Sequence, residues 1–306
     1  MMFILPWPLI AFTILAQLSV GMFVVLGVVH FFAIRNYSSE EAERLSDYAL
    51  LAIGPALVLG LLASLAHLGH PILAFLAVTN LKTSWLSWEI LLGVLFAILG
   101  GVFALMQWRK IAPFTVRNVI AWLAAIDGLA LVYVMSRIYR QPTIPSWNTV
   151  LTTLSFYTTA LLLGALGVGA AFVGSYAYLK RKNPDCEDNV CELLQRTIRG
   201  ISVTAILLLG VEFVITPLYI AYLAYSSVTS VAAVVITQTY DVIFIVRLVL
   251  VFLGAGLLGV FLYRNTLSTE RVRVMTYLTY SAFILVLIAE VLGRFMFYAS
   301  YINIGV

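Results

Sequence analysis

Long apolar runs separated by short polar or charged stretches make up nearly the whole chain. These runs fall at 7–34, 48–78, 87–108, 118–137, 151–179, 200–225, 240–263 and 274–299. Each is long enough to cross the hydrocarbon core of a bilayer, which takes about 20 residues of α-helix. Because backbone groups in lipid must be hydrogen-bonded internally, helices are the expected form of such runs. The pattern predicts an all-α integral membrane protein of about eight transmembrane helices, forming a single domain over residues 1–306.

The segments between the runs alternate between two kinds. The charged ones read RNYSSEEAERLSD, RKIAPFTVR, KRKNPDCEDNVCELLQR and RNTLSTERVR, and the aromatic, polar or Pro-containing ones read TNLKTSW, RIYRQPTIPSWN and YSSVTSVAAVVITQT. Of the 18 Lys and Arg residues, 13 lie in or beside the charged set. The positive-inside rule places that set in the cytoplasm and both termini on the periplasmic side.

Composition excludes several classes of protein. With 62% hydrophobic and 10% charged residues, the sequence has too little polar surface for a water-soluble globule. The net charge of +4 comes from loop residues that report topology, so nucleic acid is not an expected partner. The first run lacks a basic flank and a cleavage site, which indicates a retained helix. Cys186 and Cys191 are too few for an iron–sulfur cluster and badly spaced for zinc, and are interpreted as ordinary loop thiols.

Ionisable residues inside the apolar runs are candidate functional groups, because burying them in a membrane is costly. Most are expected in the outer half of the membrane, and the inner halves of the helices are almost bare. In sequence order they are His67, His70, Glu89, Asp127, Arg137, Glu212, Asp241, Arg247, Glu290 and Arg294.

Two interpretations of these groups stay open. As interhelical ion pairs, Arg294 with Glu290 or Arg247 with Asp241 would fix the helix register. The His67 imidazole, which titrates near neutral pH, could instead exchange a proton with a quinol hydroxyl. A hydrogen-bonded core histidine is the rival explanation for His67.

The histidines do not form a pattern for haem. Two haem ligands must face each other from different helices at similar depth. His67 and His70 share one helix face, and His30 is expected near the opposite membrane surface. We therefore expect no haem, and no metal in this protein, because nothing adjacent completes the His67–His70 pair.

Aromatic residues gather in the outer loops near these histidines. They are Trp85, Trp88, Tyr139 and Trp147, with Asn148 beside them. An interfacial aromatic belt explains them, and so does the wall of a quinone pocket, and the two explanations are compatible. The glycines Gly164, Gly167, Gly169 and Gly174 predict a close-packing face on the fifth helix.

Several strings together resemble the membrane anchor subunit of the bacterial dimethyl sulfoxide reductase family. They are LPWPLIAFTILAQLSVGMF, ASLAHLGHPILAF followed by LKTSWLSWEILL, RIYRQPTIPSWNTVLTTLSFYTTALLLG, and AEVLGRFMFYASY. The resemblance extends over nearly the whole sequence, and its strongest motifs fall in the outer-facing regions.

The resemblance implies a haem-free, eight-helix anchor in the bacterial inner membrane that oxidises menaquinol near the periplasmic face. Its implied partners are a four-cluster iron–sulfur subunit and a molybdopterin catalytic subunit, so the terminal substrate would be reduced on another polypeptide. The family's functional histidine matches His67, and its acidic residue after the next loop matches Glu89. Supporting positions, without assigned roles, are His70, Trp88, Arg137, Tyr139, Trp147, Asn148, Glu290 and Arg294.

Two other function classes compete with this interpretation. A transporter or proton-translocating subunit could use Asp127, Glu212 and Glu290 as a relay. Such a route should have polar groups at both depths, which the sequence does not predict. A purely structural tether is the third hypothesis, and the outer clustering of His67 and Glu89 argues against it.

Overall fold

The computed structural model describes residues 7–67, 80–182, 189–265 and 272–304. Its described part is a bundle of helices without strands. The helices are α1 (Trp7–Asn36), α2 (Ser39–His67), α4 (Trp85–Arg109), α5 (Phe114–Tyr139), α6 (Val150–Lys182), α7 (Asn189–Tyr225), α8 (Ser230–Val234), α9 (Asp241–Val251), α10 (Gly259–Asn265) and α11 (Val272–Ala299), with π-helical turns η3 (Val235–Thr239) and η4 (Phe252–Leu258).

The prediction of an all-α membrane protein is confirmed. Seven described helices are long and apolar enough to cross a membrane, and an eighth span results if one bent pair counts as a single crossing. That pair joins Ser230–Thr239 to Asp241–Gly256 at an angle of 76°. The prediction of a loop over 225–239 is therefore wrong for residues 230–239. Its Val- and Ala-rich sequence satisfies its backbone groups by helix formation, as an apolar surrounding demands.

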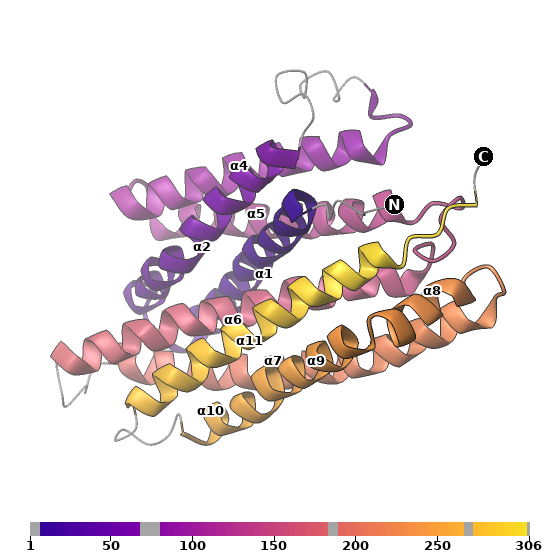
Figure 1. The fold of residues 1–306 in the computed structure, drawn as a ribbon. Helices are drawn as coiled ribbons and strands as arrows, with labels where there is room; N and C mark the ends of the chain where they lie inside the picture. The colour runs from indigo at the N-terminus through magenta and orange to yellow at the C-terminus, as the bar shows by residue number, and fades with distance from the viewer. Residues whose placement is uncertain (1–6, 68–79, 183–188, 266–271, 305–306) are drawn as a thin grey trace.

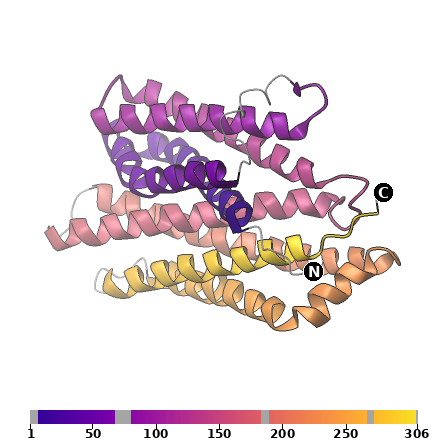
Figure 2. The same cartoon turned by 45° about the horizontal axis from the view of Figure 1, so that its top comes forward.

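The helices lie in layers, with α1 and α6 at the centre. Figure 1 shows α4 and α5 on one side and α7 with α9 on the other, and the rotated view in Figure 2 keeps that order. The central position explains why α1 and α6 are the most buried spans. Of the residues in their most apolar stretches, 72% and 83% are buried inside the bundle. The first and last described residues lie at one end of the bundle (Figure 1), which we call the terminal end.

Glycines let α1 and α6 cross at close range. A Cβ built on Gly164 would lie 2.1 Å from the carbonyl carbon of Gly21, so no side chain fits between the two backbones. A Cβ on Gly167 would similarly meet Met22, and one on Gly174 would meet Tyr280 of α11. The predicted packing face on the fifth run is confirmed at these positions, in agreement with the role of small residues between membrane helices.

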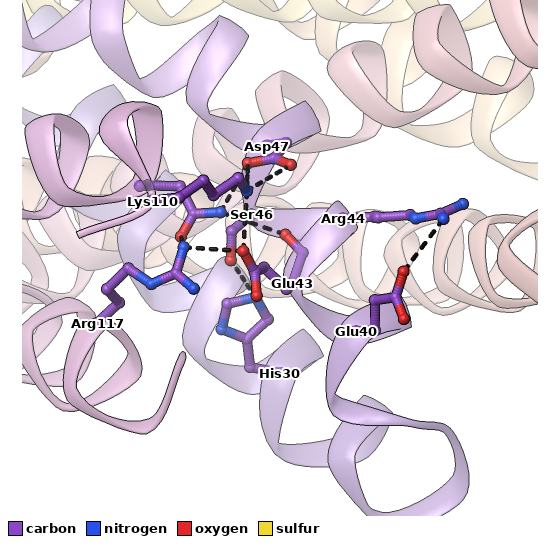
Figure 3. A network of polar contacts seen from close by, with 9 residues as sticks. His30, Glu40, Glu43, Arg44, Ser46, Asp47, Lys110 and Arg117 are labelled. Carbon is purple, nitrogen blue, oxygen red and sulfur yellow. Dashed lines mark hydrogen bonds and ion pairs between the residues drawn. The ribbon is translucent and has the colours of Figure 1, made fainter. Parts of the chain in front are cut away.

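The opposite end of the bundle, which we call the charged end, contains a polar network that is partly buried. In Figure 3, Glu43 of α2 accepts from Lys110 and from Arg117 of α5, each at 2.9 Å. His30 is fully buried, and its ring nitrogens lie 2.8 Å from Ser46 Oγ and 3.1 Å from Asn118 Oδ1. Glu43, Lys110 and Arg117 all come from charged segments that the sequence placed outside the apolar runs, so the network lies at the helix ends and the expectation of almost bare inner helix halves stays a prediction.

His30 is thus a hydrogen-bonded core histidine that ties α1 to α2 and α5.

Cys191 is disulfide-bonded, so its interpretation as an ordinary loop thiol is wrong.

Candidate functional site

The sequence-predicted pair His67 and Glu89 falls at the terminal end. His67 is the last residue of α2, and the structure describes its backbone only. His70 lies outside the described residues. Glu89 sits in the first turns of α4, whose start is fixed by the Ser84 side chain, which accepts from the Ser87 amide at 3.3 Å. A side-chain cap of this kind satisfies one of the free amides of a helix N-terminus.

Glu89 lines a groove of about 490 Å³ between α1, α2, α4 and α5. Most of the lining is aliphatic or aromatic, with Ser19 and Ser64 as the neutral polar members, and Glu89 is the one ionisable residue among the described lining positions. Ser64 and Leu65 bring the groove to within one helical turn of His67 along α2. An apolar groove with few convergent polar groups is typical of a site for a small apolar ligand.

Aromatic residues fix the position of the N-terminus of α4. The Trp88 indole donates to the Leu81 carbonyl at 3.0 Å, and the Arg137 guanidinium lies 5.1 Å from the Trp85 ring. Both tryptophans are partly exposed, at 39% and 42%. This exposure fits the expected interfacial belt for these two residues.

Trp147 departs from that expectation because it is buried. Its ring stacks on Phe297 with centroids 4.9 Å apart, and its Nε1 donates to the Phe297 carbonyl at 2.8 Å. Tyr139 packs edge-on against Trp147 and shares a hydrogen bond of 2.8 Å with the Tyr298 hydroxyl. The loop before α6 is therefore fastened to the end of α11. Asn148, in the same loop, is exposed.

A buried polar seam continues from these tyrosines across the terminal half of the bundle. Arg294, only 5% exposed, donates to Gln17 of α1 at 3.1 Å and lies over the Phe156 ring at 3.8 Å.

Farther along the seam, Glu290 accepts from Thr159 of α6 at 2.7 Å. Arg247 of α9 forms an ion pair with Glu212 of α7. The guanidinium of Arg247 passes directly over Gly293, where a Cβ would lie 2.5 Å from its Nε.

The two ion pairs expected from sequence are not the ones that form. Arg247 pairs with Glu212 rather than with Asp241, whose carboxylate instead accepts from the Val242 amide. Arg294 makes no ion pair within the described residues, and its partner is Gln17. The reason is orientation: Arg247 faces α7 and α11, whereas Asp241 begins α9 at the break after Tyr240.

Sequence reasoning missed Gln17, Thr159 and Tyr298 as members of this seam. Gln17 is a polar residue in the middle of the first apolar run, and Tyr298 follows Arg294 by one helical turn. Both signals were present, but uncharged polar residues in membrane helices are too common to single out. Asp127, in the middle of α5, stays apart from the seam, with one carboxyl oxygen lacking a partner in the described region.

A second, smaller cavity of about 90 Å³ lies between α6, α7, α9 and α11 at the terminal end. Arg247, Glu290 and Arg294 contribute its charged lining. Across the described ranges, no three His, Cys, Asp or Glu side chains lie close enough together to hold a metal ion.

Comparisons with known proteins agree over nearly the whole length of the protein. A family model described as DMSO reductase anchor subunit (DmsC) matches residues 2–300. An anaerobic dimethyl sulfoxide reductase subunit of Haemophilus influenzae is 30% identical over 298 residues, which cover 97% of this protein and 95% of that relative. An Escherichia coli subunit of the same name is 28% identical over 309 residues, which cover 98% and 96%. The bd oxidase from Geobacillus thermodenitrificans shares the fold, with a TM-score of 0.61 at 12% identity, over 96% of this protein and 84% of the matched oxidase polypeptide.

Proposed function

This protein belongs to the family of DMSO reductase anchor subunits, and from that membership we propose that it oxidises a membrane quinol, menaquinol by family resemblance. Membership and the apolar helices make it a multi-pass membrane protein that associates with the catalytic subunits of its complex. The quinol role, the nature of the partners and the sidedness are the proposed part.

The groove that holds Glu89 is the observation that carries the proposal. Its volume is about 490 Å³, and its lining includes one carboxyl group, that of Glu89. Leu61, Leu65 and Leu86 belong to its lining and are exposed, so the groove opens on the outer surface of the bundle. An isoprenoid quinol needs this combination, because its tail partitions into lipid while its head group requires a few polar partners. The end of α2, where His67 lies, adjoins the groove at Leu65.

Quinol oxidation releases two protons and two electrons from the head group. Glu89 and His67 are the proposed hydrogen-bond partners of the two hydroxyl groups and the first acceptors of their protons. The electrons leave to an iron–sulfur subunit, which passes them to a molybdopterin subunit. We place both partners on the terminal end, which the positive-inside rule assigns to the periplasm of a bacterial inner membrane.

The test is oxidation of a reduced menaquinol analogue by membranes that contain the intact complex. Glu89→Gln keeps the shape of the side chain and removes its basicity, and we expect quinol oxidation to fall by about 10²-fold or more. His67→Ala is expected to act in the same direction. In both variants the catalytic subunit should keep its activity toward an artificial soluble electron donor.

Asp127→Asn is the matched control. It removes a buried carboxylate that lies outside the groove, so its quinol oxidation should equal that of the parent. Unchanged oxidation in Glu89→Gln and His67→Ala would remove the groove from the reaction and favour a purely tethering role. A loss in Asp127→Asn alone would favour the relay expected of a proton-translocating subunit.

A further inference from the structure

Another apolar groove, of about 410 Å³, runs between α1, α6 and α7 toward the charged end of the bundle. Its lining extends along α1 from Val24 to Tyr37, which directly follows the helix, and along α7 from Leu208 back to Leu193. At about 1.5 Å per residue, each stretch is about 20 Å long, close to half of a bilayer that is about 40–45 Å thick with its head groups. The groove therefore has the depth of one membrane leaflet. Its described lining shares no residue with that of the Glu89 groove.

Most of the groove wall is aliphatic or aromatic. The hydroxyl groups of Thr197 and Thr204 both donate to backbone carbonyls of their own helix, so they offer no free donor to a ligand. Val28 and Phe32 of α1 are 44% and 58% exposed, so the groove opens on the outer surface of the bundle. In a membrane this surface faces lipid, and a hydrocarbon chain laid in the groove gains dispersion contacts with the wall.

The groove has a polar end, and it lies at the charged end of the bundle. There the guanidinium of Arg196 lies 5.9 Å from the centre of the Tyr37 ring. The Tyr37 hydroxyl is buried without a hydrogen-bond partner in the described region. A buried hydroxyl without a partner is costly, so an acceptor atom supplied by a ligand would be favourable at this position.

An ion pair with Glu192 does not exhaust the hydrogen-bonding capacity of Arg196. The two side chains approach to 2.6 Å, but they are 68% and 54% exposed, and such surface pairs contribute little. A guanidinium carries five N–H donors in a planar fork, which matches the geometry of a phosphate. Arg196 can therefore bind a phosphate group while it stays beside Glu192.

The two grooves differ in the head group that they suit. The Glu89 groove offers a carboxyl, which accepts protons and hydrogen bonds. This groove offers the Arg196 guanidinium and the Tyr37 hydroxyl, which donate hydrogen bonds, and the arginine adds a positive charge. A ligand that fits must combine a long hydrocarbon chain with a negatively charged acceptor at the level of the membrane surface. A phospholipid has both, whereas a quinol head group is uncharged.

We propose that this groove binds one anionic phospholipid in the leaflet at the charged end. One acyl chain lies along α1 and α7, and the phosphate lies at Arg196 and Tyr37. The lipid fills the space between these helices and so completes the packing of this part of the bundle. The proposal is independent of quinol oxidation, because the site is separate from the Glu89 groove.

Lipid retention by the intact complex tests this site. The purified complex is stripped of lipid in detergent and incubated with phosphatidylglycerol or phosphatidylcholine that carry the same acyl chains. Native mass spectrometry then counts the lipid molecules retained. We expect the parent to retain one phosphatidylglycerol about tenfold more tightly than phosphatidylcholine, since hydrogen bonds between charged groups are about twice as strong as neutral ones.

A substitution at Gly200 tests the apolar part of the groove. A Cβ at Gly200 meets nothing within 4 Å, so Gly200→Leu places its side chain in the groove without a clash against the bundle. Retention of the phosphatidylglycerol should fall at least about tenfold. Gly210→Leu is the matched control, because Gly210 is equally open, lies on the same helix and is outside the groove lining. It should retain lipid as the parent does.

A substitution at Arg196 tests the head-group part. Arg196→Gln removes the charge and should make the retention of phosphatidylglycerol and phosphatidylcholine equal. Arg44→Gln is the matched control, because Arg44 forms a similar exposed pair with Glu40 four residues away and lies outside the groove lining. This control should keep the preference for phosphatidylglycerol.

Three results would overturn the proposal. Equal retention of the two lipids by the parent would exclude the phosphate site, and this comparison requires no variant to assemble. Retention in Gly200→Leu as tight as in the parent would place the lipid elsewhere. Displacement of the phosphatidylglycerol by an equal concentration of a menaquinone analogue would identify a quinone groove instead.

Discussion

The crossing of α1 and α6 offers a direct test of how this bundle is held together. Gly164→Ala places a Cβ 2.1 Å from the Gly21 carbonyl carbon, whereas ordinary contact begins at 3.4 Å. The clash is between two backbones, so no change of rotamer relieves it, and the helices must separate by roughly 1 Å at this point. A gap of that size forfeits a quarter to a half of each dispersion contact along the interface. We expect a loss of about 3 kcal/mol in the free energy of unfolding, at the upper end of overpacking effects.

The assay is unfolding of the purified full-length protein in mixed micelles of rising sodium dodecyl sulfate, followed by tryptophan fluorescence. Gly101→Ala is the matched control, because a Cβ there meets nothing within 4 Å. Alanine is a better helix former than glycine, so that variant should be unchanged or stabilised by up to about 1 kcal/mol. Equal stability of the two variants would refute backbone contact at Gly164 as the determinant of the crossing.

Three further predictions concern the polar networks, and the same unfolding assay checks each. Arg247→Met should lower the free energy of unfolding by about 3–5 kcal/mol, because it leaves the Glu212 carboxylate buried without its cation. Adding Glu212→Gln should recover most of that loss. A double variant as unstable as Arg247→Met alone would contradict the ion-pair explanation. At the charged end, Arg117→Met should cost several times more than Lys110→Ala, because the side chains are 4% and 48% exposed, and equal costs would show that burial is not decisive. Trp147→Phe should cost about 1 kcal/mol, since it removes one of the two donors to the Phe297 carbonyl, and a neutral result would show that the Ser300 hydroxyl, the other donor, satisfies that carbonyl alone.

The candidate site could be predicted only in part from the sequence. Membrane depth follows from position along an apolar run, so the placement of Glu89 near the terminal end of its helix was correct. The groove around it could not be foreseen, because it is formed by side chains of α1, α2, α4 and α5 that are far apart in the sequence.

Partner choice among charged residues was equally out of reach. Asp241 and Arg247 lie six residues apart, which turns them to different faces of α9, and the break after Tyr240 turns Asp241 farther from the core. Arg247 reaches Glu212 only because Gly293 leaves a path across α11.

The sequence by itself determined that this is a membrane-spanning helical protein, where most of its helices run and where along each helix the ionisable groups sit. These properties depend on local hydrophobicity and on the rise of about 1.5 Å per residue, so no knowledge of neighbouring helices is required. Only the tertiary structure decided that α1 and α6 form the centre, that Trp147 is buried, and that Arg247 pairs with Glu212. Those outcomes depend on the rotation and crossing of each helix, which packing between distant segments sets.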